Sequence, residues 1–125
     1  MRLNQVTLPA TDVASSVAFY RGLGFALIVD APHYARFQAA AGDATFSVER
    51  MDGPMGAARA IVYFECDDLD RRVAALEAKG VTFIHGPRDE PWFWREARLR
   101  DPAGNVICLY YAGDNRLNPP WRIEA

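Results

Sequence analysis

The chain repeats one physical pattern twice, and this repeat restricts its fold more than any other feature. When the sequence is shifted by 56 positions, residues 5–28 fall on residues 61–84 without a gap. Few residues are identical, but apolar side chains recur at i, i+4 and i+7 in both copies, and Gly24 falls on Gly80. The repeat predicts two similar modules, a size that 125 residues can accommodate.

Each copy has the pattern of a strand, a helix and a strand. Residues 5–8 and 61–65 are short β-prone runs. Helix caps follow at Thr11 or Asp12 and at Asp67 or Asp68, and the apolar spacing predicts a one-sided helix after each. A glycine ends each helix, and residues 25–29 and 81–84 are predicted as the next strands.

A hairpin completes each module. Residues 34–50 are predicted to turn at Gly42-Asp43, and residues 94–111 at Gly104-Asn105, with residues 85–94 as extra chain in the second copy. The predicted order is βαβββ twice, which is an α+β fold. We place the first module at 1–50, a linker at 51–59, the second module at 60–112 and a C-terminal tail at 113–125.

A four-stranded sheet with one helix has one covered face and one bare face, so two modules can bury their bare faces together or curl around a shared cleft. Alternation along the strands indicates which side chains lie on the bare face, although a one-residue slip would exchange the two faces. The predicted bare-face set in the second module includes Glu96, Arg98, Cys108 and Tyr110. By the same rule Thr45, Ser47 and Glu49 share one side, as do Ile61, Tyr63 and Glu65.

Composition argues against several classes of function. The formal net charge is -2 and no basic stripe is present, which gives no reason to expect nucleic acid. No apolar run approaches the roughly 20 residues that span a bilayer, and the first residues lack the apolar segment of a signal peptide. Two cysteines are too few for a disulfide scaffold, so we expect reduced thiols in a cytoplasmic protein.

The βαβββ duplication, the run AFYRGLGF at 18–25 and the run RDPAGNVICLY at 100–110 together resemble the vicinal-oxygen-chelate superfamily. That group includes glyoxalase I, extradiol dioxygenases, and fosfomycin and bleomycin resistance proteins. The resemblance covers about residues 1–112. It implies two modules forming a curved mixed sheet around a cleft, usually in a homodimer.

In metal-dependent members of that group, His, Gln or Glu ligands come from the first, fourth, fifth and eighth strands. The corresponding positions here are Gln5, Ser47, Ile61 and Cys108. Glutamine is acceptable, but a hydroxyl is a poor ligand and isoleucine has no donor atom. Glu49 is a substitute for one position. We therefore expect no metal and no other cofactor.

Three stretches have both a structural and a functional interpretation. Cys108 is either a small buried residue, which we favour, or a nucleophile activated by a neighbouring group such as Arg98. Glu96 and Arg98 form either a solvated strand edge, or an ion pair or anion anchor in the cleft. Trp92 and Trp94, in the run PWFW, either pack at a dimer interface or against the tail, or form a wall that stacks on a flat ligand.

The leading hypothesis is a metal-independent, non-catalytic protein of the bleomycin-resistance type that sequesters a small organic molecule in an aromatic cleft. The alternatives are a lyase, isomerase or dioxygenase with an atypical metal set including Gln5 and Glu49, and an interaction domain whose cleft is filled by its own chain. We expect a homodimer and no nucleic-acid or membrane partner. The predicted ligand-binding residues are Gln5, Ser47, Glu49, Tyr63, Trp92, Trp94, Glu96, Arg98, Cys108 and Tyr110.

Overall fold

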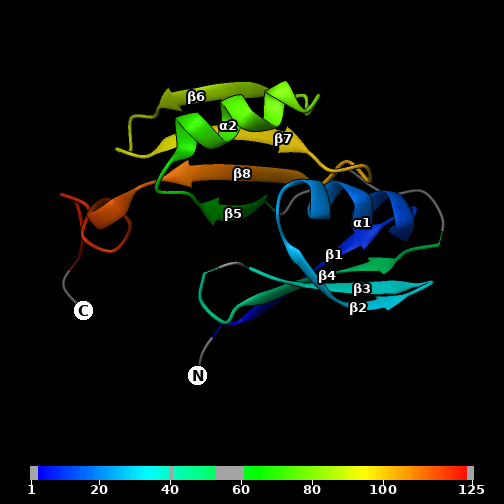
Figure 1. Cartoon of the computed structure of the whole chain (residues 1–125). Helices are drawn as coiled ribbons and strands as arrows, with labels where there is room; N and C mark the ends of the chain where they lie inside the picture. The colour runs from blue at the N-terminus through cyan, green and yellow to red at the C-terminus, as the bar shows by residue number, and fades with distance from the viewer. Residues whose placement is uncertain (1–2, 40, 53–60, 124–125) are drawn as a thin grey trace. The chain divides into compact units, whose positions relative to one another are not determined.

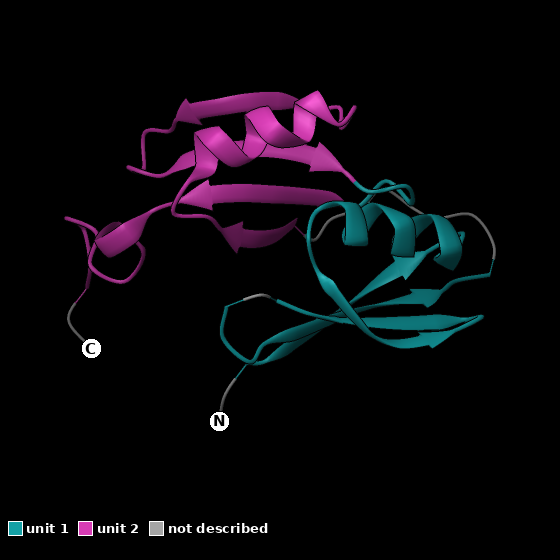
Figure 2. Ribbon diagram, in the orientation of Figure 1, with its two compact units in different colours: residues 1–59, 101–105 teal, residues 60–100, 106–125 magenta. Residues whose placement is uncertain are grey.

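A computed structural model describes residues 3–39, 41–52 and 61–123. The chain forms two units, each a four-stranded mixed sheet with one helix (Figures 1 and 2). Unit 1 contains residues 1–59 and 101–105, and unit 2 contains residues 60–100 and 106–125. The predicted α+β class and the βαβββ element order are both confirmed.

Unit 1 has the strand order β1-β4-β3-β2, with β1 parallel to β4 and the other pairs antiparallel. Its core is aromatic: Tyr20 of the helix lies 4.9 Å from Phe46, and Phe37 stacks on Phe46 at 5.0 Å between ring centroids. The elements are β1 (Gln5–Ala10), α1 (Val13–Gly22), β2 (Ala26–Ala31), β3 (Tyr34–Gln38) and β4 (Thr45–Arg50).

Unit 2 repeats this topology with the order β5-β8-β7-β6 and β5 parallel to β8. Helix α2 lies across one sheet face (Figure 1). Its core is aliphatic and includes the buried side chains of Val73, Leu99 and Ile107. The elements are β5 (Ile61–Glu65), α2 (Leu69–Ala78), β6 (His85–Asp89), β7 (Arg95–Arg100), β8 (Val106–Tyr111) and a 3₁₀ turn, η1 (Gly113–Arg116).

Both helices begin and end as the sequence indicates. Asp12 caps α1 by accepting hydrogen bonds from the backbone N–H groups of Ala14 and Ser15, whereas Asp68 precedes α2 without a side-chain cap bond. Gly24 and Gly80 adopt positive φ angles of 104° and 93°, which glycine tolerates best. The apolar spacing predicts that Val17 lies on the buried side of α1. In the structure Ser16 is fully buried there, and Val17 is only partly buried.

The predicted strand at residues 81–84 is wrong, because the strand that follows α2 is β6. The earlier segment meets β7 only at its end, where the Ile84 N–H donates to the Arg98 carbonyl. Strand β6 pairs with β7 through His85, Arg88 and Asp89, with an irregularity between His85 and Arg88, where Pro87 has no N–H to donate. Residues 85–94 are therefore an edge strand and a short loop, not an inserted loop throughout.

The turn that joins β7 to β8 is part of unit 1. Asp101 is buried and accepts hydrogen bonds from the Tyr20 hydroxyl at 2.8 Å and the Asn105 side-chain amide at 2.7 Å. The same Asn105 amide donates to the Pro9 carbonyl at 2.8 Å, and Gly104 takes a φ of 90°. The aspartate-proline-alanine-glycine-asparagine run thus forms a turn whose two buried end residues, Asp101 and Asn105, bind α1 and β1, while Pro102 is exposed.

Most of the predicted linker lies outside the described residues, which resume at Ile61. The described part of the predicted tail begins with η1, which Glu65 holds by accepting hydrogen bonds from the Ala112 and Gly113 N–H groups at 2.9 and 3.0 Å. Within the described ranges, no helix is long and apolar enough to cross a membrane.

Candidate functional site

The strand register of unit 2 gathers polar and aromatic side chains on the sheet face opposite α2. Residues directly opposite one another in neighbouring strands point to the same side. Tyr63 pairs with Cys108, and Cys108 pairs with Arg98, while Glu96 pairs with Tyr110. The predicted bare-face set of β7 and β8 is therefore the observed one. Tyr111 alternates with Tyr110 toward the helix side, but it lies at the strand end and is 44% exposed.

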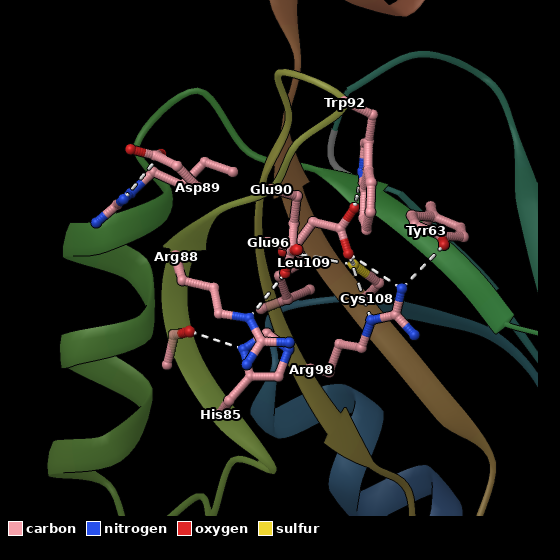
Figure 3. Close-up of polar contacts among 12 residues, drawn as sticks. Tyr63, His85, Arg88, Asp89, Glu90, Trp92, Glu96, Arg98, Cys108 and Leu109 are labelled. Carbon is pink, nitrogen blue, oxygen red and sulfur yellow. Dashed lines mark hydrogen bonds and ion pairs between the residues drawn. The ribbon is translucent and has the colours of Figure 1, made fainter.

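Glu96 is the centre of this face. Its side chain is only 1% exposed, yet its carboxylate accepts hydrogen bonds from three donors (Figure 3). They are the Trp92 indole N–H at 2.6 Å, the Arg98 guanidinium at 3.1 Å and the Cys108 thiol at 3.6 Å. A buried carboxylate is tolerated only when it is paired and hydrogen-bonded, and these contacts meet that requirement. Glu96 therefore holds a loop residue and two strand residues together.

Arg98 links this carboxylate to the outer edge of the face. Its Nη2 also donates to the Tyr63 hydroxyl at 3.2 Å, and its side chain is 26% exposed. Burial acts to lower the pKa of Arg98, but the hydrogen bond to Glu96, together with the charges of Tyr63, Cys108 and Glu96, outweighs it, so the pKa is raised. Arg98 and Glu96 are therefore an ion pair in the folded protein, one of the interpretations that the sequence left open.

Cys108 is fully buried beneath this pair. Burial, together with the charge of Glu96, raises the pKa of its thiol to about 12. The thiol is therefore protonated at neutral pH and lacks the thiolate character of a nucleophile. This supports the interpretation of Cys108 as a small buried residue that lines the site.

The aromatic residues of the site divide into a packed pair and an accessible pair. Trp94 stacks on the buried Tyr110 with 4.7 Å between ring centroids, and Tyr63 meets both rings edge-on. Tyr63 and Trp92 are 40% and 41% exposed. The accessible rings stand beside the ion pair, so flat apolar surface and hydrogen-bonding groups occur together.

The loop between β6 and β7 separates its three aromatic residues. The Phe93 N–H donates to the Glu90 carbonyl at 3.0 Å, and Phe93 itself has a φ of 67°, a conformation that bulky residues rarely adopt. This turn orients the Trp92 indole toward Glu96 and leaves Phe93 57% exposed. The Phe93 ring centroid lies 5.5 Å from that of Trp121 in the tail. Of the packing partners that the sequence left open for this loop, the tail is therefore the one that Phe93 meets.

The predicted site residues of unit 1 lie on its own sheet face opposite α1. The Gln5 side-chain oxygen accepts a hydrogen bond from the Thr45 hydroxyl at 2.8 Å, and Ser47 shares one with Thr7 at 2.8 Å. Glu49 is exposed and pairs in register with Pro9, four residues along β1 from Gln5. Arg36, which was not among the predicted site residues, lies opposite Ser47 on this face and donates to the Tyr34 hydroxyl at 2.9 Å.

The sequence matches one protein family over residues 2–109, nearly its whole length. This chain belongs to the Glyoxalase/Bleomycin resistance protein/Dioxygenase superfamily. The resemblance inferred from the duplication and from the turn before β8 is thus confirmed, and the superfamily fold accounts for the two βαβββ units.

Three solved structures illustrate the range within this superfamily. A glyoxalase/bleomycin resistance protein/dioxygenase from Nocardioides has a TM-score of 0.79 at 20% identity, with 99% of this chain and 90% of that chain covered. A bleomycin-binding protein in complex with bleomycin has a TM-score of 0.75 at 23% identity, with 89% of this chain and 98% of that chain covered. A lactoylglutathione lyase from Agrobacterium tumefaciens has a TM-score of 0.74 at 20% identity, with 88% of this chain and 92% of that chain covered. A binding protein and an enzyme are equally similar, so the fold does not separate these activities.

The superfamily resemblance implies metal ligands on β1, β4, β5 and β8, and the residues at those positions do not suit a metal. Ile61 has no donor atom, and the Ser47 hydroxyl, a poor ligand, is already hydrogen-bonded to Thr7. Gln5 and Glu49 are separated by four residues of strand, about 13 Å, which is far for two ligands of one ion. Among the described residues, no group of three or more His, Cys, Asp or Glu side chains is placed to hold a metal.

Unit 1 also has a shallow hollow of about 330 Å³ beside the start of α1. Asp30 supplies a charge to its lining, and Asp12 already caps the helix there. The hollow lacks, among its described lining residues, the combination of ring faces and hydrogen-bond donors that the bare face of unit 2 presents. Its lining is Val13, Ala14, Asp30, Ala31 and Pro32.

Proposed function

We propose that this protein binds a small organic molecule on the bare sheet face of unit 2, without a metal and without chemical conversion. The observation that carries the proposal is the Glu96 cluster: a buried carboxylate, held by Trp92, Arg98 and Cys108, beside the accessible rings of Tyr63 and Trp92. A buried charge is costly to maintain, and such groups are frequent at functional sites.

The chemistry of the face favours binding over catalysis. Its thiol is protonated, and its carboxylate is enclosed by donors rather than open to a substrate proton. General acid–base and nucleophilic catalysis both need a reactive group within reach of the ligand. Sequestration needs affinity alone, which ring stacking and hydrogen bonds supply. A bleomycin-binding protein of the same fold supports this kind of function.

The predicted contacts from unit 1, Gln5, Ser47 and Glu49, remain part of the proposal as a second polar face.

We also propose that the protein acts as a cytoplasmic homodimer. The two unpaired cysteines suit a reducing compartment, and the exposed Phe93, Leu117 and Trp121 are apolar side chains that an interface would cover.

The test is a metabolite and drug-fragment screen by thermal shift, with affinities then measured for Trp92→Ala and for Trp121→Ala as a matched control. We expect the screen to find ligands that stabilise the wild type. Trp92→Ala should bind them at least tenfold more weakly, which corresponds to the loss of one ring contact, and Trp121→Ala should bind them about as tightly as the wild type. Unchanged affinities together with loss of the dimer in Trp92→Ala would instead assign this loop to the interface.

Metal dependence is measured on the same protein. Mass spectrometry before and after incubation with nickel, zinc, manganese and iron is expected to find no stoichiometric metal. Near-stoichiometric metal that Gln5→Ala abolishes would favour the enzyme alternative, and the assays would then be those of glyoxalases and dioxygenases.

A further inference from the structure

The charges around the Glu96 cluster are paired. Glu96 is paired with Arg98, and two further carboxylates have cationic partners. Glu65 lies 3.8 Å from the Arg116 guanidinium, and Glu90 accepts a hydrogen bond from Arg88 at 2.7 Å (Figure 3 shows the second). Arg100 shares the side of Arg98 on β7, at the end of the face away from Glu65, and it too has an interaction partner. A charged ligand beside the Glu96 cluster therefore finds these charges already engaged.

The hydrogen bonds within the cluster leave donors, not acceptors, at its accessible edge. Glu96 is enclosed, and the Trp92 N–H and the Cys108 thiol are already directed to it. The Tyr63 oxygen accepts from Arg98, so its own proton is free to point outward; burial raises the pKa of this hydroxyl and keeps it protonated. The Nη1 of Arg98 donates to no group in the described residues.

The accessible surface next to these donors is flat. The rings of Tyr63 and Trp92 are each about two-fifths exposed, and Figure 3 shows Tyr63 beside the Arg98 guanidinium and Trp92 beside the Glu96 carboxylate. The Trp92 ring is fixed by its bond to Glu96, and the Tyr63 ring by its contacts with Trp94 and Tyr110. Rings held in place lose little entropy when a planar ligand stacks on them.

We propose that the ligand is an electrically neutral, planar molecule with a carbonyl or similar oxygen, which accepts hydrogen bonds from Tyr63 and Arg98. In this assignment, which rests on the proposed function, Glu96 sets the specificity of the site. Its negative charge cancels the attraction that Arg98 alone would exert on a carboxylate, so an anion loses its hydration without gaining an ion pair. Arg98 is thus a hydrogen-bond donor to a neutral group, not an anion anchor.

Three probes that share one ring system test this class. They are 2-naphthamide, which is neutral with a carbonyl oxygen, 2-naphthoate, which is an anion of nearly the same shape, and 2-naphthylmethylammonium, which is a cation. Isothermal titration calorimetry on the wild type should give the tightest binding for the amide, by about tenfold over either ion. Tighter binding of either ion by the wild type would overturn the proposal.

Glu96→Gln tests the role of the carboxylate, since glutamine keeps the shape and one of the two acceptor oxygens but removes the charge. We expect the affinity for 2-naphthoate to rise about tenfold and that for 2-naphthamide to change by less than about threefold. The matched control is Asp89→Asn, which removes one negative charge from an 84% exposed side chain of the same unit. Unchanged 2-naphthoate affinity in folded Glu96→Gln would refute the role of Glu96.

Arg98→Gln is the second variant, and it serves also where Glu96→Gln fails to fold. It should weaken 2-naphthamide and strengthen 2-naphthylmethylammonium, because the charge of Glu96 is then uncompensated. The reverse pattern would contradict the proposal. If none of the three probes binds but the broader screen still finds ligands whose affinity Trp92→Ala lowers, the proposed ligand class is wrong and the proposed function stands. If that screen finds no ligand, the proposed function itself is rejected.

Discussion

The hydrogen bond between Tyr20 and Asp101 allows a quantitative test of what holds the turn before β8 in unit 1. The Tyr20 side chain is fully buried, and its hydroxyl donates to Asp101, which also accepts from the Ala103 and Asn105 backbone N–H groups at 3.0 and 2.8 Å. Burial and the Asp101 charge raise the pKa of Tyr20, so the hydroxyl remains a donor at every working pH.

Two single variants and their combination separate the contributions. Tyr20→Phe removes one hydrogen bond to a charged acceptor and should lower the free energy of unfolding by about 2 kcal/mol. Asp101→Ala removes the acceptor for four donors and leaves the Tyr20 hydroxyl buried without a partner, at a cost of about 3–5 kcal/mol. In the double variant that hydroxyl is gone, so its cost should not exceed that of Asp101→Ala.

Urea unfolding followed by circular dichroism measures all three free energies. The expected coupling energy between the two positions is about 1.5–2 kcal/mol. Tyr111→Phe is the control, because the Tyr111 side chain is 44% exposed at the end of β8, and its cost should stay within about 0.5 kcal/mol. Strictly additive costs for Tyr20→Phe and Asp101→Ala would show that the two side chains do not depend on each other and would refute this account of the turn.

Two further predictions concern buried groups. Ser16→Ala should raise the melting temperature, because the Ser16 hydroxyl is fully buried with no hydrogen-bond partner among the described residues, and its removal gains about 1 kcal/mol; a lower melting temperature in a thermal scan would contradict this. The raised pKa of Cys108 means that the unfolded chain releases the proton first, so stability falls from about pH 9 to 12, by at most about 1.4 kcal/mol per pH unit. Cys108→Ala should flatten that fall in urea titrations, and an unchanged slope would reject the assigned cause.

The sequence predicted those features that depend on local periodicity. Apolar residues at helical spacing, such as Val73, indicated the buried side of α2. The two-residue alternation of β7 and β8 put Glu96, Arg98, Cys108 and Tyr110 on one face, and the strand register shows them there. Glycine marked the helix ends because few other residues adopt positive φ at low cost. These signals act over a few residues, so one sequence is enough to recognise them.

Features that depend on distant contacts were not predictable in the same way. Residues 81–84 have higher β propensity than residues 85–89, but pairing with β7 decided which segment became the strand. The bond from Trp92 to Glu96 depends on the unusual backbone of Phe93, for which the sequence carries no glycine signal. The contact between Tyr20 and Asp101 joins residues 81 positions apart.

The membership of the turn 101–105 in unit 1 has a consequence for the order in which the chain can fold during synthesis. Unit 1 is mostly N-terminal, yet the acceptor for its buried Tyr20 hydroxyl is made only after β5, α2, β6 and β7. At about 5–20 residues per second, several seconds pass between the end of β4 and the arrival of Asp101. Throughout that interval the nascent unit 1 has an unsatisfied polar group in its aromatic core, so its final stability is gained only when the C-terminal hairpin emerges.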